Sequence, residues 1–389
     1  MRKFRKVIFW THLTSGLLAG IVIFIMSVTG ALLSFERNII EFSERDMRYA
    51  PDSAGAAKLS PQQVIDKLRE QRPDAKPSAM TITNEPNAAW LIAFGREGQV
   101  FANPYTGEIT GEGNKAVRGF FTEMRDWHRW VALSGDQRPI GKAITGACNL
   151  LFLLLAMSGI YIWFPRKLEW KRIKPVFWFR RGVRGKARNF NWHNVIGFWT
   201  SLVLIVLTLT ATVISYQWAS NLLYTLTGNE APQQQGSPGG GASQAEQAYA
   251  WPENLDAAWA TGENQSPGWK SLSLRLPIAK DSAVFTIDEG IYWNIFGRST
   301  LTVDTKTASV TKWEPYGEQN AGRQLRSWFR FTHTGETGGL PGQIIGFAAC
   351  IGGAFLVWTG FSLALRRFRN WLKRRPFAAA GSETAESEA

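Results

Sequence analysis

The chain of 389 residues contains four histidines, and each lies at the end of an apolar segment. His12 and His193 lie just inside two long uncharged runs, whereas His128 and His333 shortly precede two others. A b-type haem takes two neutral imidazoles on opposite faces of its iron, supplied by neighbouring helices. Four histidines at two levels therefore predict two haems, with His12 and His193 at the inner level and His128 and His333 at the outer level.

Basic residues accompany these histidines. Arg125 and Arg330 each stand three residues before an outer histidine. Residues at this spacing share a helix face, so each guanidinium could meet a haem propionate. Lys6 and Arg188 are near enough to the inner pair in sequence to serve its propionates.

Other interpretations of the histidines stay open. A single histidine at a membrane interface is commonly an amphipathic anchor or a helix hydrogen-bonder. Zinc or copper is the rival metal, but structural zinc takes four close nitrogen or sulfur ligands and each level offers two. No Cys-x-x-Cys-His occurs, which excludes covalent c-type haem. Cys148 and Cys350 are not beside any histidine in sequence, and we expect small core residues, with a role near a redox centre left open.

Four stretches without Asp, Glu, Lys or Arg are each longer than the ~20 residues that span a bilayer core. They are residues 7–35, 143–165, 189–229 and 337–365. The chain is 45% hydrophobic and has 18 Trp, and these four runs concentrate its apolar residues in predicted membrane helices. The first run follows a basic N-terminus but lacks a clear small-x-small cleavage site, which favours a retained signal anchor.

Basic residues crowd the N-terminus, the 166–188 loop and the tail, and the loop has ten Lys or Arg against the single Glu169. The positive-inside rule places all three segments in the cytoplasm. The net charge of +13 is then a topology signal and needs no nucleic acid. The predicted organisation is residues 1–36 (N-terminus and first span), 37–139 (first external module), 140–165 (second span), 166–188 (basic loop), 189–219 (third span), 220–336 (second external module), 337–365 (fourth span) and 366–389 (cytoplasmic tail).

The external regions show helix and strand patterns. Ser60-Pro61 and the apolar residues after it predict a capped helix. Alternating segments predict strands over 88–94, 99–102 and 103–109, and over 271–276, 283–287, 299–304 and 308–311. A Gly-rich stretch at 236–241 is typical of a flexible linker.

The two halves resemble each other. His12 and His193 are each followed by glycine at +4 and threonine at +17. The second and fourth spans end in Ser158-Gly159 and Thr359-Gly360. We therefore expect a parallel two-fold repeat, although small residues are also ordinary packing devices in membrane helices.

The histidine pattern, Trp127-His128-Arg129-Trp130, Asn191-Trp192-His193 and the 103–108 hairpin together resemble the PepSY-associated transmembrane family of bacterial inner-membrane proteins. The resemblance implies an α-helical membrane protein with four transmembrane helices, two periplasmic α+β modules and a two-fold repeat. Its best understood branch is similar to the FoxB-type siderophore reductases, which contain haem. The second module departs from the family hairpin, because Ala308 stands where the first module has Gly107.

The resemblance implies electron transfer to a periplasmic ferric siderophore, with His12, His128, His193 and His333 as ligands of haem b. No Gly-x-Gly-x-x-Gly nucleotide motif is present, so an external donor is required, either a quinol or a cytoplasmic reductase. Two alternatives remain: a quinol-linked haem protein with another acceptor, and a non-redox protein whose external modules bind peptides or a protease. No nucleophile triad, carboxylate pair or zinc signature supports a hydrolase.

Overall fold

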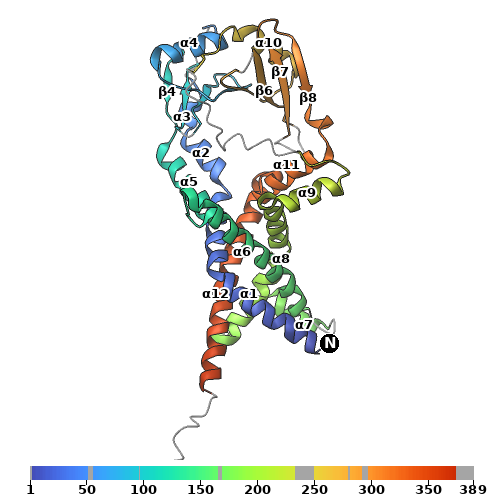
Figure 1. Ribbon diagram of the computed structural model, residues 1–389. Coiled ribbons are helices and arrows are strands. Elements are labelled where there is room, and N and C mark those ends of the chain that lie inside the picture. The colour runs from blue at the N-terminus through green and yellow to red at the C-terminus, as the bar shows by residue number, and fades with distance from the viewer. Residues whose placement is uncertain are drawn as a thin grey trace, which may run out of the picture. The chain divides into compact units, whose positions relative to one another are not determined.

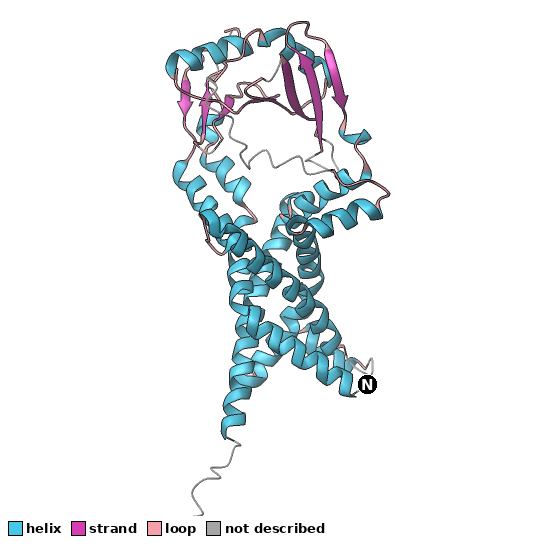
Figure 2. Ribbon diagram, viewed as in Figure 1, coloured by secondary structure: helices cyan, strands magenta, loops and turns pink. Residues whose placement is uncertain are grey.

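The chain folds into two compact units. The computed structural model describes residues 2–50, 56–95, 97–164, 169–232, 249–278, 281–290 and 297–373. The helical unit comprises residues 1–34, 124–215 and 340–389, and the sheet unit comprises residues 35–123 and 216–339. The described strands all belong to the sheet unit (Figures 1 and 2).

Among the described residues, four helices are long and apolar enough to cross a membrane, as the sequence predicts. They are α1 (Arg2–Leu33), α6 (Arg138–Trp163), α8 (Gly185–Ser215) and α12 (Gly339–Lys373). α6 packs against both α1 and α8. Within the apolar interior, Asn149 of α6 donates to the Thr208 carbonyl and the Thr212 hydroxyl of α8, both at 3.0 Å. These bonds satisfy an amide that would be costly to bury unpaired.

The predicted basic loop contains a short helix, α7 (Trp170–Phe177). Asn191 of α8 holds it in place. Its side chain accepts from the Arg180 main-chain N–H at 2.8 Å and donates to the Pro175 carbonyl at 2.8 Å. The start of α8, which carries His193, is therefore tied to the loop before it.

The sheet unit contains one antiparallel sheet of eight strands, in the order β4-β3-β2-β1-β5-β6-β7-β8. Its strands are β1 (Ala79–Thr83), β2 (Trp90–Ala93), β3 (Gln99–Ala102), β4 (Ile109–Gly111), β5 (Ser271–Arg275), β6 (Ser282–Asp288), β7 (Arg298–Asp304) and β8 (Val310–Glu314). The two predicted modules are thus the two halves of one sheet. They join where β1 pairs with β5, from Ala79 opposite Arg275 to Thr83 opposite Ser271.

Two helices cover one face of this sheet. They are α4 (Pro61–Gln71), which is capped by Ser60 as predicted, and α10 (Leu255–Gln265), which the sequence patterns did not indicate. Their buried side chains share one core with alternate residues of the strands, including Met80, Leu274 and Phe285. The remaining helices are α2 (Glu36–Ser43), α3 (Arg45–Arg48), α5 (Lys115–Trp130), α9 (Gln217–Leu226) and α11 (Ala321–His333). The predicted linker at 236–241 lies outside the described residues.

The hairpin turns of the two halves have the same geometry despite the Gly107 to Ala308 difference. Asn103 accepts from the N–H of Tyr105 at 2.8 Å, and Asp304 accepts from the N–H of Lys306 at 2.9 Å. Gly107 has φ +74° and Ala308 has φ +55°. The departure from the family pattern therefore leaves the turn intact, at the cost of placing an alanine in left-handed conformation.

We predict that Ala308→Gly stabilises the sheet unit by about 0.5–1 kcal/mol, because glycine adopts this φ without steric cost. Gly107→Ala should destabilise it by roughly 1–2 kcal/mol, since a Cβ there would lie 2.8 Å from Cγ of Lys67. Denaturant unfolding of the detergent-solubilised protein measures both changes. Equal destabilisation by the two substitutions would contradict this account of the turn.

Candidate functional site

His12 and His193 face each other inside the helical unit. His12 projects from α1 and His193 from α8, and their ring centroids are 6.4 Å apart with an angle of 84° between the rings. The two histidines lie in different halves of the sequence. The predicted inner pair is therefore brought together by the fold.

A hydroxyl from a further helix holds each inner imidazole. Ser158 Oγ of α6 lies 2.8 Å from Nδ1 of His12, and Thr359 Oγ1 of α12 lies 2.9 Å from Nδ1 of His193. Both hydroxyls already donate to their own helices, Ser158 to the Leu155 carbonyl and Thr359 to the Phe355 carbonyl. They are left to accept from Nδ1–H, which leaves the lone pair of each ring on Nε2.

The distance between the rings is compatible with one shared metal ion, which His12 and His193 would hold. With a metal–nitrogen bond of about 2 Å and roughly 1 Å from nitrogen to ring centre, two imidazoles on opposite sides of one metal would place their centroids about 6 Å apart. The 6.4 Å separation agrees with that value. Outer-shell hydrogen bonds to the second ring nitrogen are usual for metal-bound histidine, and both rings have one.

His128 of α5 is held by the same kind of bond. Thr29 Oγ1 of α1 lies 3.0 Å from its Nδ1 and donates to the Ile25 carbonyl at 2.7 Å. A Cβ at Gly30 would lie only 3.2 Å from Cε1 of His128 and 3.3 Å from Sγ of Cys350. Gly30 thus makes room for the ring, and the fold brings Cys350 next to a histidine that is distant in sequence.

The end of α5 is fastened to α6, which fixes the position of His128. Thr145 of α6 donates to the Arg129 carbonyl at 2.8 Å. Directly after α5, Val131 and Ala132 have φ of +52° and +57°. Left-handed conformation is rare for a β-branched residue, so the surrounding packing must over-determine this turn.

A comparison with models of known protein families agrees with this architecture. The model of the PepSY-associated TM region matches residues 9–367. The chain belongs to this family. The match contains all four histidines, both spans of each repeat and the sheet unit. No curated protein matches the chain.

In this PepSY-associated protein, the outer pair is divided between the two units. His128 belongs to the helical unit, and His333 ends α11 in the sheet unit. Arg125 lies one turn before His128 on α5, and Arg330 lies one turn before His333 with its guanidinium 6.0 Å from the Phe331 ring centroid. The outer haem and the role of both arginines therefore stay predictions.

The two predicted inner-rim cations differ in their surroundings. Arg188 stacks on Trp192, with its guanidinium carbon 5.2 Å from the ring centroid. Lys6 lies six residues before His12 on α1, which at about 100° per residue places it on a different face of the helix. Arg188 lies five residues before His193 and is rotated from it by about 140°, so the helical phase favours neither cation as a partner for an inner propionate.

Within the residues that the structure describes, no three His, Cys, Asp or Glu side chains gather around a common point. A pair of histidines with a planar group between them needs no such cluster. The sequence patterns did not assign a role to Ser158 or Thr359, although both were singled out as the residues before the repeated glycines.

If His12 and His193 hold a haem as the sequence predicts, Thr359→Val and Ser158→Ala should weaken its retention roughly 10–100-fold without abolishing it, because outer-shell bonds typically contribute that much to metal affinity. Haem transfer to apomyoglobin measures retention, and a redox titration of the remaining haem measures the midpoint potential. Thr200→Val, on α8, is the matched control, since its hydroxyl bonds only the Ile196 carbonyl. Unchanged retention and potential in both variants would contradict the role of these hydroxyls.

Proposed function

We propose that this PepSY-associated protein is a haem-b-containing inner-membrane reductase that passes electrons across the membrane to a periplasmic ferric siderophore. The observation that carries the proposal is the His12–His193 pair, with ring centroids 6.4 Å apart and each Nδ1 against a hydroxyl. A membrane interior is an expensive place for two unused imidazoles, so a ligand role is the default interpretation.

Under this proposal His12 and His193 hold the inner haem, and His128 and His333 hold the outer one. Bound haem would supply one-electron redox chemistry within the membrane. The protein contributes neutral imidazoles with the proton on Nδ1 and an apolar surrounding from four helices. Arg125 and Arg330 would hold the outer propionates.

Reduction is a sensible release step for siderophore iron. Hard oxygen ligands bind ferric iron much better than ferrous iron, so one electron loosens the chelate without hydrolysis. The electron comes from an external donor, a quinol or a cytoplasmic reductase. The ferric chelate is the substrate and the ferrous ion is the product.

The test begins with the visible spectrum of detergent-purified protein from haem-replete cells. We expect a Soret band and sharp α and β bands on reduction, typical of two imidazole ligands. Anaerobic mixing of the reduced protein with a panel of ferric siderophores should then reoxidise the haem, with ferrous iron trapped by ferrozine. A colourless preparation would overturn the proposal in favour of a peptide- or protease-binding protein. Reoxidation by quinones alone would favour a haem protein with another acceptor.

A further inference from the structure

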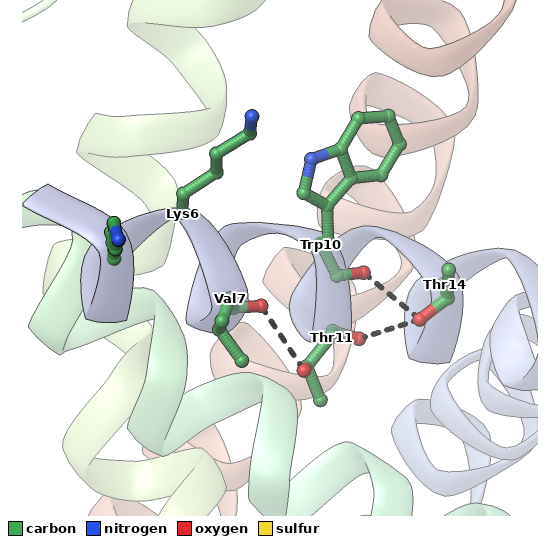
Figure 3. A pocket seen from close by; sticks show the side chains of 6 residues that line it. Lys6, Val7, Trp10, Thr11 and Thr14 are labelled. Carbon is green, nitrogen blue, oxygen red and sulfur yellow. Dashed lines mark hydrogen bonds between the residues drawn. The ribbon is translucent and has the colours of Figure 1, made fainter.

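A shallow groove of about 480 Å³ runs along one face of α1 near its basic end (Figure 3). Its lining residues are Lys3, Lys6, Val7, Trp10, Thr11 and Thr14. At about 100° per residue, this face is opposite to the face that carries His12. The groove is therefore distinct from the inner histidine pair.

The end of the groove is positively charged. Lys3 and Lys6 are exposed on α1, and Arg367 of α12 adds a third cation. Its guanidinium carbon lies 5.1 Å from the ring centroid of Trp10 and 5.2 Å from that of Phe9. Within the described part of the chain, none of these three cations forms an ion pair with a carboxylate.

The other end of the groove is apolar despite its threonines. Thr11 donates to the Val7 carbonyl at 3.1 Å, and Thr14 donates to the Trp10 carbonyl at 2.9 Å (Figure 3). Because both hydroxyls are engaged by the helix backbone, a hydrocarbon chain can pass over them without leaving a donor unpaired. Trp10, with 44% of its surface exposed, lies between the cationic and apolar ends. Tryptophan favours the headgroup level of a bilayer.

We infer that this groove binds one anionic glycerophospholipid of the leaflet that the positive-inside rule assigns to the cytoplasm. Lys3, Lys6 and Arg367 hold its phosphate, Trp10 lies at the glycerol level, and one acyl chain follows Thr11 and Thr14. Basic sites between transmembrane helices on this side of a membrane suit such headgroups. Since α1 carries His12 and α12 carries Thr359, the lipid ties the helix of His12 to the helix whose hydroxyl contacts His193.

Native mass spectrometry and thermal unfolding of the detergent-purified full-length protein test this inference. Phosphatidylglycerol should bind with a preference over phosphatidylcholine of the same chains, and it should raise the melting temperature. The double variant Lys6→Ala/Arg367→Ala should bind phosphatidylglycerol about thirtyfold more weakly, since each basic residue contributes about 1 kcal/mol at an anionic surface. Lys3→Ala should add to this loss.

The matched control is Arg369→Ala/Lys373→Ala, which removes the same charge from the end of α12 away from Trp10. It should weaken lipid binding clearly less than Lys6→Ala/Arg367→Ala does, because Arg369 and Lys373 line a separate groove at the end of α12. An unchanged visible or far-ultraviolet spectrum shows that each variant is folded. Equal loss in both double variants, equal binding of phosphatidylcholine, or displacement by inorganic phosphate or a short-chain quinone would each overturn the inference.

Discussion

Under the proposed function, His193→Ala should remove one of two haems and leave the other. Haem at the inner level would then have His12 as its single histidine ligand, and a bis-imidazole spectrum cannot be maintained by one histidine. His12→Ala should give the same result, because the two ring centroids lie 6.4 Å apart and the rings would serve one centre. The pyridine haemochrome assay against protein concentration should fall from two haems per chain to one.

The outer histidines provide the comparison for this experiment. His128→Ala should remove the other haem, so the double variant His128→Ala/His193→Ala should be colourless. Thr200→Val, on α8, is again the control, since its hydroxyl bonds the Ile196 carbonyl of its own helix. If His12→Ala and His128→Ala abolished the same centre, the pairing of His12 with His193 would be wrong.

Glu44→Ala should destabilise the sheet unit by roughly 3 kcal/mol, the second large effect we expect. The Glu44 side chain is fully buried. It accepts from the Arg118 guanidinium at 2.5 and 2.7 Å, from Arg48 at 3.3 Å and from the Asn114 N–H at 3.0 Å. Its removal leaves these donors unpaired and detaches α3 from the start of α5. Denaturant unfolding followed by tryptophan fluorescence measures the loss.

Glu41→Ala is the matched control, because the Glu41 carboxylate is 42% exposed and pairs with Arg37 within the same helix. An exposed pair of this kind contributes about 0.3–0.5 kcal/mol. A similar small effect for Glu44→Ala would show that its ion pairs do not outweigh the cost of burying them.

The same carboxylate gives the sheet unit an acid-sensitive contribution to stability. Burial alone would raise the pKa of Glu44, but the hydrogen bonds from Arg118 and Asn114 and the charges of Arg118 and Arg48 lower it below its ordinary value of 4.5. A lowered pKa means that the folded state favours the ionised form, so this contribution is present above pH 4.5 and is lost as the pH falls through the folded pKa. The ion pairs with Lys115 and Arg72 also lower the pKa of Glu112 to about 2, which adds a background slope. The acid unfolding slope below pH 4.5 should be shallower in Glu44→Gln than in the parent.

The sequence predicts those elements of the fold that depend on a pattern of neighbouring residues. The four spans follow from uninterrupted apolar runs, and α4 follows from its Ser60 cap. β1 was not predicted although it is longer than β2 and β3, and α10 was not predicted because Gly262 interrupts its pattern. The joining of β1 to β5 leaves no local pattern, since its partners are nearly 200 residues apart.

The sequence predicted the histidines of the candidate site but not the contacts that hold them. Scarcity made the histidines conspicuous, and the +17 threonine pointed to Thr29, which contacts His128. The contact distances of His12 with Ser158 and of His193 with Thr359 depend on how three helices cross, which hydropathy does not encode. For the same reason Cys350 was expected far from any histidine, whereas it lies against Gly30 beside His128.

The central β1–β5 pairing has a consequence for how the sequences of the two halves of the chain can diverge from each other. Antiparallel strands pair symmetrically, so a chain with one repeat would satisfy its open β1 edge by associating with an identical copy. Such a homodimer must present the same hydroxyl to both inner imidazoles. Covalent fusion removes this constraint, and the chain already has serine on one side and threonine on the other. The surroundings of His12 and His193 can then be tuned separately, which a symmetric homodimer cannot achieve.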